Sequence, residues 1–482
     1  MTLQGLLTFI GLLLASYSAI RQPYRDLVRI FIRPLPVLYW ILPALLALLL
    51  PHVVRVAGIE VCADTAALAE IVGFLLPVGC LGYCILAFGR GRLTRGRAPL
   101  LRQAWRSSQS EGAFEGIRWV IERNLLRLHS VAEPDLLDSF FDSHFVDKTI
   151  AAKSWLHLEM LASGKLVASL PDRYAASDAV IRALLAARGT VVHRWVTKHH
   201  GGLERATLTE GELTLLHSTF ETPAWYMKVA AYYPLAVYPI ERLASGEYDE
   251  EYNGNGEFYG LGQGTAGRSY CPIWVASKLM SMSISRAIAE RENGDMYVST
   301  LWDVFRSVVD RSRRKAFIEH SRARSEQPTP FAFLMNDICR DMEELCREAC
   351  RLGMTRDTQI ADPEQVPQLR ISVQMWAGCL GYIACHPDSS SNEFRENLLL
   401  EYLNFMLQVG FWPRDAHIAD DEEVDEVIRS VYRDLLASSL RDALRGSPGK
   451  ALLVGASERL DRPKTWVRMG EEWFRDYAEG IR

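Results

Sequence analysis

A glycine-rich segment near the middle of the chain has the residue types that bind phosphate. Its glycines have the spacing of a dinucleotide-binding loop, and the Arg-Ser pair that follows stands where a P-loop has Lys and Ser or Thr. Glycines let backbone N–H groups converge on a phosphate, a cation neutralises it, and a hydroxyl reaches Mg²⁺. The residues that would make these contacts are Gly262, Gly264, Gly267, Arg268 and Ser269.

Both phosphate-binding motifs require a hydrophobic strand immediately before the glycines. Here residues 248–257 precede them, and this stretch is acidic and turn-like, so it would repel phosphate. The segment therefore has two interpretations, a nucleotide site or a flexible glycine loop between helices. The acidic stretch also resembles the start of an EF-hand, but Gly260 stands at the twelfth position, where calcium needs a bidentate Glu.

Metal and catalytic motifs are otherwise weak. Cys339, Cys346 and Cys350 share a helix face, but zinc sites usually take paired ligands from turns, and buried thiols on a helix are common. Residues 193–200, which contain three histidines, could form a phosphate- or metal-binding edge, and so could the group Asp142, His144 and Asp147. Neither group has a diagnostic spacing. We predict no metal and no cofactor, and the class of enzyme, if any, stays open.

The elements that would position these residues follow a first part of a different kind. Three uncharged runs open the chain, Met1–Ile20, Pro34–Val54 and Ile71–Gly89. At 1.5 Å per residue, a helix of about 20 residues crosses the hydrocarbon layer of a bilayer and satisfies its own backbone there. We predict spans at about 3–20, 35–54 and 71–89, and none of them contains Asp, Glu, Lys or Arg. Such spans indicate an anchor, or the wall of an oligomeric pore, rather than a transporter.

The charges between the runs predict an orientation. Residues 1–106 hold eleven arginines and four acidic residues, a net charge of +7, whereas the whole chain carries −5. The loop between the second and third runs holds Arg55 with Glu60, Asp64 and Glu70. The positive-inside rule then places this loop and the N-terminus outside, with the arginines in the cytoplasm. The arginines at the interface are Arg21, Arg25, Arg29, Arg33, Arg90, Arg92, Arg95 and Arg97.

Two further patterns concern the membrane part. The first four interface arginines recur every four residues among apolar residues, which fits an interfacial helix on anionic headgroups or a charged stop-transfer linker. Gly11, Ala15 and Ala19 form a stripe of small residues that lets helices approach closely. The stripe could pack against the neighbouring spans or against a second copy of the chain.

The rest of the chain, net −12, is predicted to be a mainly α cytoplasmic body. Apolar residues recur at three and four through 148–163, 171–187, 273–290, 295–311, 330–352, 364–385, 393–410 and 421–444. Short strand candidates are Thr190–His193 and Lys450–Val454, so any β contribution is minor. We divide the chain into a transmembrane unit (1–89), an Arg-rich linker (90–112), a helical lobe (113–243), a Gly- and Tyr-rich loop (244–270) and a second helical lobe (271–482).

The partners follow from charge and composition. A body with net −12 is a poor binder of nucleic acid, so none is expected, despite a basic stretch at residues 311–324. Aromatic residues are dense through 220–274 beside the glycine loop, which suits core packing or a protein-binding surface. We therefore expect a lipid bilayer with anionic headgroups and a protein partner or a second copy as partners.

The layout of short spans followed by a larger helical body resembles that of bacterial membrane-anchored sensors and membrane-targeting anti-phage effectors. The 45 arginines against nine lysines suggest a GC-rich bacterial genome. The leading hypothesis is an inner-membrane protein whose cytoplasmic body is a sensor or interaction domain, with a membrane-acting effector of a stress or anti-phage system as one version. The alternative is a membrane-tethered nucleotide-binding enzyme that uses the Gly262–Ser269 loop.

Overall fold

The structure is a computed structural model of the full chain. It describes residues 34–58, 62–90, 111–131, 134–151, 155–187, 189–200, 208–220, 231–245, 271–313, 330–355, 358–366, 368–411, 426–445 and 449–460, and the single residues Thr8, Gly11, Ile32, Leu93, Leu101 and Tyr477. The prediction of a mainly α protein is confirmed, and the described residues contain no strand. The chain forms two compact units, Met1–Asp172 and Arg173–Arg482.

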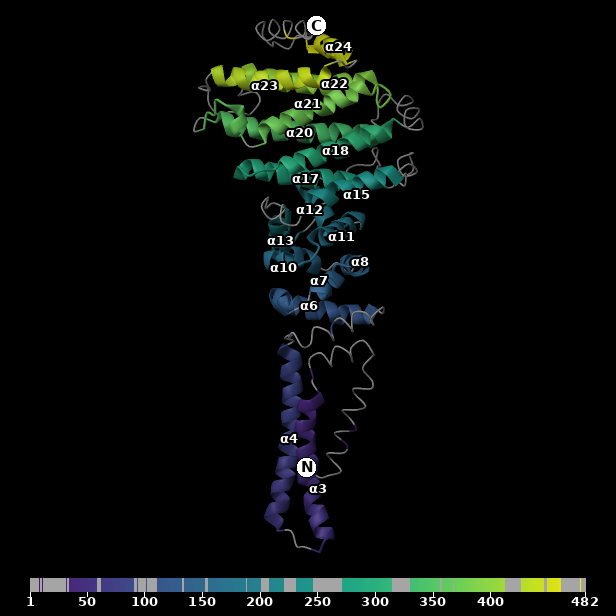
Figure 1. The fold of residues 1–482 in the computed structure, drawn as a ribbon, viewed down its shortest axis with the longest axis vertical. Coiled ribbons are helices and arrows are strands. Elements are labelled where there is room, and N and C mark those ends of the chain that lie inside the picture. Colours follow the sequence, from purple (N-terminus) through teal and green to yellow (C-terminus); the bar gives the residue numbers. More distant parts are fainter. Residues whose placement is uncertain are drawn as a thin grey trace. The chain divides into compact units, whose positions relative to one another are not determined.

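The first unit contains a hairpin of two long helices, α3 (Pro34–Val56) and α4 (Ala63–Arg90) (Figure 1). The helices are antiparallel, because Gly79 lies against Trp40 at one end and Gly73 lies against Leu48 farther along. The glycines have no side chain, so the bulky residues of α3 can approach the backbone of α4 closely. As a result, Pro34 and Arg90 mark the same end of the hairpin, and the connection between the helices marks the other end.

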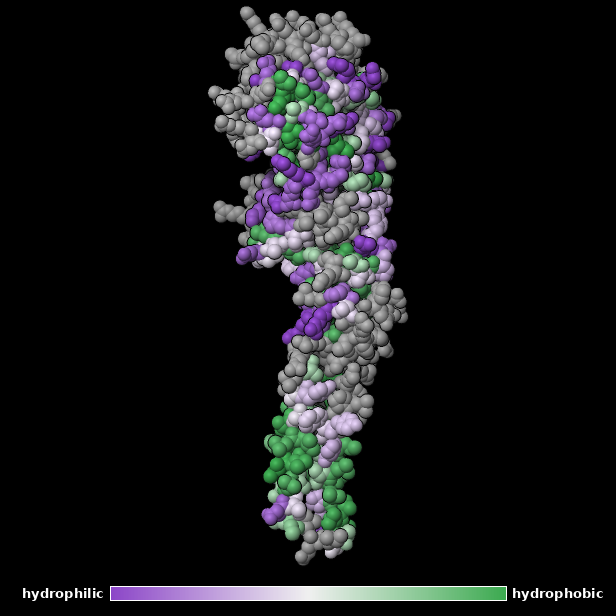
Figure 2. Space-filling view, turned by 60° about the vertical axis from the view of Figure 1, so that its left-hand side comes forward, coloured by the Kyte–Doolittle hydropathy of each residue, from purple (hydrophilic) through white to green (hydrophobic). Residues whose placement is uncertain are grey.

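Both hairpin helices are long and apolar enough to cross a membrane, and they are the two such helices found among the described residues. Only 12% of the apolar window in α3 and 17% of that in α4 is buried, whereas a core helix of a soluble protein is mostly buried. Large apolar side chains point outward instead, and Figure 2 shows the hydrophobic surface that they form. They include Leu42, Leu46, Leu50, Leu68, Ile71, Phe74, Leu75 and Val78.

The other described helices of the first unit follow the hairpin, and all but α6 are shorter than ten residues. They are α6 (Glu111–Val131), α7 (Pro134–Phe140), α8 (Ser143–Ala151), α9 (Leu156–Ala162) and α10 (Gly164–Ala168). The helix α9 packs against α6, α8 and α10, and the rings of Phe140 and Phe145 are fully buried. One polar contact links sequence-distant parts: the Asn124 side chain accepts a hydrogen bond of 2.7 Å from the backbone N–H of Leu93.

The second unit is built from helices that lie across one another in successive layers (Figure 1). Its smaller helices are α11 (Arg173–Ala186), α12 (Val191–His199), α13 (Glu210–Phe220) and α15 (Tyr232–Ser245). The longer ones are α17 (Pro272–Glu290), α18 (Asp295–Ser312), α20 (Pro330–Met354), α21 (Leu369–Cys385), α22 (Asn392–Phe411), α23 (Glu426–Leu444) and α24 (Gly449–Leu460), with a 3₁₀ turn, η4 (Pro363–Gln365), before α21.

The core of the second unit lies between α17, α18, α20 and α21. In α17 nearly every residue from Pro272 to Ser281 is buried, so this helix is enclosed on all sides. Helix α20 buries one face, which carries Phe331, Leu334, Ile338 and Leu345 at spacings of three, four and seven. Trp376 of α21 fills the space next to Tyr402 and Phe405 of α22, with ring centroids 4.5 and 5.4 Å away.

Several predicted elements differ from the structure. Both strand candidates are helical: Thr190 is the N-cap of α12, its side chain accepting from the His193 N–H, and residues 450–454 lie within α24. The third predicted span begins earlier, at Ala63, because the helix continues beyond the apolar run and Asp64 complements the positive end of its dipole. The predicted helix 148–163 is divided between α8 and α9.

The first predicted span lies outside the described residues except for Thr8 and Gly11. The described residues therefore contain two candidate membrane helices, and the first predicted span stays a prediction. The predicted linker 90–112 and loop 244–270 also fall almost entirely outside the described residues, and the predicted domain boundaries stay predictions.

Candidate functional site

The predicted phosphate-binding residues Gly262, Gly264, Gly267, Arg268 and Ser269 lie outside the described residues. The acidic turn at 248–257 does as well. The nucleotide-binding interpretation of this loop is therefore not tested by the geometry and stays a prediction.

The predicted membrane-interface arginines lie in sequence next to the ends of the hairpin. Arg90 is the last residue of α4 and Arg33 directly precedes α3, so the two arginine-rich segments flank the same end. The arginines at positions 21, 25, 29, 33, 92, 95 and 97 are outside the described residues. Of the small-residue stripe, Ala15 and Ala19 are outside them too, and Gly11 is an exposed helical residue.

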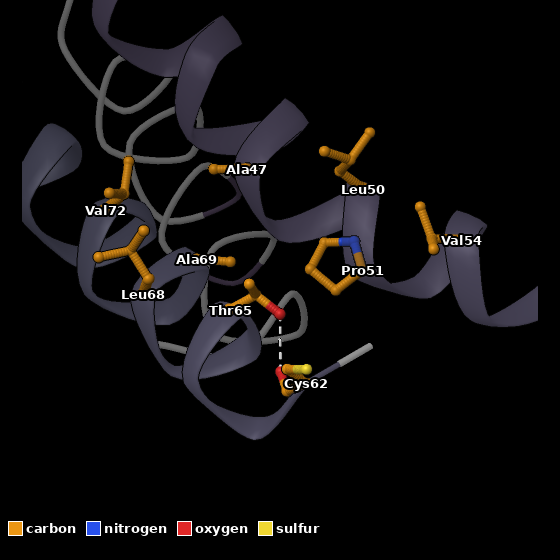
Figure 3. A pocket seen from close by; sticks show the side chains of 9 residues that line it. All are labelled: Ala47, Leu50, Pro51, Val54, Cys62, Thr65, Leu68, Ala69 and Val72. Atoms are coloured by element: carbon orange, nitrogen blue, oxygen red, sulfur yellow. Dashed lines mark hydrogen bonds between the residues drawn. The ribbon is translucent and has the colours of Figure 1, made fainter. Parts of the chain in front are cut away.

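An apolar groove lies between the two hairpin helices near their connection (Figure 3). It has a volume of about 520 Å³, and at its edge the Thr65 hydroxyl donates to the Cys62 carbonyl oxygen at 2.7 Å. The small side chains of Ala47 and Ala69 leave this space open. The groove is lined by Ala47, Leu50, Pro51, Val54, Cys62, Thr65, Leu68, Ala69 and Val72.

A group of charged side chains is buried in the second unit where α17 packs against α20. We call it the Lys278 cluster, and it consists of Lys278, Asp337 and Asp341. The two helices run parallel here, because Trp274 contacts Asp337 and, one turn later, Lys278 contacts Asp341. Asp337 and Asp341 are four residues apart, so they lie on the same face of α20 and both reach the lysine.

The local sequence explains how α17 presents Lys278. The helix begins at Pro272, whose fixed φ suits the first helical position, and the Cys271 sulfur accepts from the Trp274 N–H at 3.5 Å. Its first ten residues are otherwise apolar except for Ser277 and Ser281, and the Ser277 hydroxyl donates to the Trp274 carbonyl oxygen at 2.8 Å. Lys278 is therefore carried into the core by a helix that is buried all round.

The hydrogen bonds of the two carboxylates are unequal. Asp337 Oδ2 lies 2.7 Å from Lys278 Nζ and accepts from Trp274 Nε1 at 2.8 Å. Asp341 Oδ1 accepts from Lys278 Nζ, but Asp341 Oδ2 is buried and has no hydrogen-bond partner in the described part of the chain. The Asp341 side chain is 3% exposed and that of Asp337 is 18% exposed, so Asp341 has the less favourable surroundings for a charge.

Electrostatics follow from this arrangement. The pKa of Asp341 is raised to about 7: burial raises it, the positive charge of Lys278 opposes the rise, and the nearby Asp337 adds to it. Burial lowers the pKa of Lys278, but the two carboxylates outweigh burial and the pKa is raised overall. The cluster would carry −1 with all three groups ionised, and one proton on Asp341 brings it to zero. Near neutral pH the cluster is therefore poised between these two states.

His200 borders the cluster at the end of α12. Its ring centroid lies 6.2 Å from that of Trp274, nearly perpendicular to it. Burial, with a smaller contribution from the positive charge of Lys278, lowers the pKa of His200 to about 4, so the imidazole is neutral at pH 7. Its Nε2 is buried and has no hydrogen-bond partner among the described residues. The predicted edge at residues 193–200 thus contributes one residue to the surroundings of the cluster.

Chemically, the cluster can take up and release a proton. A lysine between two carboxylates remains charged, and a charged amine is not a nucleophile. Lys278, Asp337 and Asp341 were not predicted from the sequence, although the sequence contains one signal for them. A lone lysine within an apolar helix is rarely buried without a partner, and a pair of acids four residues apart on an apolar helix face would supply that partner.

The other candidate residues have structural surroundings. No group of three or more His, Cys, Asp or Glu side chains among the described residues is arranged to hold a metal ion. Burial raises the pKa of Cys379 and its contact with Cys339 raises it further, so the Cys379 thiol stays protonated. Asp142 accepts from the His144 N–H at 3.0 Å at the start of α8, which is a helix-capping contact.

No protein-family model matches the chain, and no curated protein or solved structure has significant similarity to it. The function must therefore be inferred from the geometry and chemistry of the chain itself.

Proposed function

We propose that the protein is an integral protein of a bacterial inner membrane, anchored by the α3–α4 hairpin, with a cytoplasmic helical body that serves as a sensor or interaction domain. A membrane-acting effector of a stress or anti-phage system is one form of this function. The observation that carries the proposal is the exposed apolar surface of the hairpin.

The apolar surface of the hairpin would be costly to expose to water. Leu46 is 60% exposed, Leu75 is 58% exposed, and similar side chains surround both helices. Each large apolar side chain left in water forgoes about 1.5 to 3 kcal/mol of burial energy, and monomeric soluble proteins rarely leave such a large continuous apolar patch uncovered. Lipid chains remove this cost without any further protein contact, and a helical hairpin satisfies its own backbone hydrogen bonds there.

The charge distribution supports the orientation. Because the hairpin is antiparallel, both arginine-rich segments adjoin its Pro34/Arg90 end, whereas Glu60 and Asp64 adjoin its connection. Under the positive-inside rule, the end with the arginines is cytoplasmic. The body that follows Arg90 along the chain is then cytoplasmic as well. This arrangement needs only the two hairpin helices and does not depend on the first uncharged run.

The anchoring can be tested with arginine substitutions on the exposed face. Leu46 and Leu75 lie at about the same level of the hairpin, since Leu48 contacts Gly73 and Trp40 contacts Gly79. An arginine in the middle of a span costs about 2.5 to 3.5 kcal/mol of insertion energy. We expect wild-type protein to stay in the membrane pellet after alkaline carbonate washing and the Leu46→Arg/Leu75→Arg variant to be lost from it.

The matched control is Val56→Arg, at the end of α3, where the side chain is 88% exposed and an arginine can reach headgroups or water. We expect this variant to stay in the pellet. If water covered the hairpin surface, both arginine variants would behave alike, and wild-type protein would appear in the supernatant. That outcome would exclude the membrane anchor.

A further inference from the structure

The Lys278 cluster lies in the second unit and is not part of the hairpin that carries the proposed membrane anchor. Lys278 and Asp341 are buried and Asp337 is half-buried at the contact of two parallel helices, and the two carboxylates outnumber the lysine. Replacing a buried ion pair with apolar residues of similar volume is often neutral or stabilising, so an extra buried carboxylate is a cost to the fold rather than a support.

The unpaired carboxylate oxygen shows where the charge can be neutralised. Asp337 has two donors on one oxygen, Lys278 Nζ and Trp274 Nε1, and is the better stabilised anion. Asp341 has one donor, on Oδ1, and its Oδ2 is buried without a partner among the described residues. A proton on Asp341 removes the excess charge and keeps the Lys278–Asp337 ion pair.

We propose that the Lys278 cluster is a proton-operated latch between α17 and α20, closed when Asp341 is protonated and loosened when Asp341 is ionised. In the closed state the cluster is neutral, and Lys278 joins both carboxyl groups of α20. In the loosened state the ionised side chains of Asp337 and Asp341 repel each other, and water is drawn to the contact of α17 and α20 to solvate them.

The groups that act on Asp341 come from each neighbouring element. They are Lys278 on α17 and Asp337 and Glu344 on α20, while His200 at the end of α12 faces Lys278 and Asp337. The other helices packed on α20 direct titratable groups elsewhere: Cys379 of α21 contacts Cys339, Glu401 of α22 lies near Glu343, and the Tyr432 hydroxyl of α23 donates to the Ile360 carbonyl oxygen. Tyr297 of α18 packs against Tyr232.

The sign of the pH effect follows from linkage. The folded pKa of Asp341, about 7, lies above the ordinary value of 3.8, so the folded state binds the proton more tightly than the unfolded state. Its contribution to stability is complete below pH 3.8 and is lost as the pH rises to about 7. The latch is thus closed in acidified cytoplasm and opens as the pH rises through neutrality.

Hydrogen exchange on the full-length protein in lipid nanodiscs tests the latch. After correction for the intrinsic pH dependence of exchange, we expect peptides covering 274–285 and 334–345 to exchange several-fold faster at pH 8 than at pH 6. Asp341→Asn cannot ionise, so it should protect these peptides equally at both values. The control Asp303→Asn removes an exposed charge from α18 and should retain the wild-type transition.

A second variant keeps the test decisive if Asp341→Asn does not fold. Asp337→Asn removes the repelling charge, so Asp341 should ionise more easily and the exchange transition should move to lower pH. A purely structural role of Asp337 would instead lower protection equally at every pH. Exchange that is the same at pH 6 and pH 8 in wild type, or a transition retained in Asp341→Asn, would overturn the latch. Membrane fractionation is independent of both results.

Discussion

His157 shows how a single side chain sets a pH limit on the first unit. It is 1% exposed, its Nε2 lies 2.7 Å from the Phe140 carbonyl oxygen, and its ring packs edge-on against Phe141 and Phe145. Donation to that carbonyl places the proton on Nε2. Nδ1 is then a bare nitrogen, buried and without a partner among the described residues. A second proton would have to enter an apolar site.

This arrangement predicts acid sensitivity. Burial lowers the pKa of His157 from 6.5 to about 4, so protonation favours the unfolded state, and stability is lost as the pH falls from about 6.5 to about 4. The full loss corresponds to about 3 kcal/mol. His157→Gln can keep the hydrogen bond but cannot titrate. We expect the free energy of opening of α9, measured by hydrogen exchange, to fall as the pH is lowered in the wild type and to stay constant in the variant. The same dependence of this free energy on pH in both proteins would contradict the prediction.

Helix α21 crosses helix α23 closely at Gly381, and the sequence alone does not predict this contact. A Cβ at Gly381 would collide with the carbonyl oxygen of Ala443 in α23, which is backbone and cannot move aside. A Cβ at Gly378, one turn earlier, would be 3.8 Å from the Trp302 ring, an ordinary contact distance. The close contact between α21 and α23 therefore requires glycine at position 381, whereas a larger residue fits at position 378.

Alanine substitutions at Gly381 and Gly378 are expected to have different effects on stability. Gly381→Ala should push α21 and α23 apart and destabilise the second unit by about 1 to 3 kcal/mol. Gly378→Ala should be neutral, or stabilising by up to about 1 kcal/mol, because alanine favours the helix. Thermal unfolding of the detergent-solubilised protein measures both. An equal change in stability in the two variants would show that the close contact of Gly381 with Ala443 does not decide the effect.

Elements with a long periodic pattern were predictable and contacts between them were not. The pattern predicts helices at 295–311 and 393–410, and the structure has α18 at Asp295–Ser312 and α22 at Asn392–Phe411. Four residues such as Thr190–His193 are too few to separate a strand from a helix, and the capping contact of Thr190 decides for the helix. Lys278 and Asp341 are 63 residues apart, so only the packing of α17 on α20 reveals that they pair.

At the scale of the whole molecule, the proposed orientation assigns opposite sides of the membrane to two natural reporter groups. Cys62, beside the hairpin connection, and Cys385, at the end of α21, are the exposed cysteines among the described residues. With the arginines inside, Cys62 faces the exterior and Cys385 faces the cytoplasm. The remaining described cysteines are buried or half-buried, so they react slowly and contribute little background.

A membrane-impermeant maleimide should therefore label the protein through Cys62 in cells whose outer membrane alone has been opened. Labelling through Cys385 should require a breach of the inner membrane. Cys62→Ser should abolish the first signal and Cys385→Ser the second, which assigns each signal to its residue. If Cys385 is labelled before Cys62, the protein has the opposite orientation in the membrane, although the hairpin still anchors it. Equal labelling of Cys62 and Cys385 in cells with an intact inner membrane would mean that the two thiols lie on the same side of it. The proposed orientation requires a lipid barrier between them, and an impermeant reagent can then reach Cys62 alone.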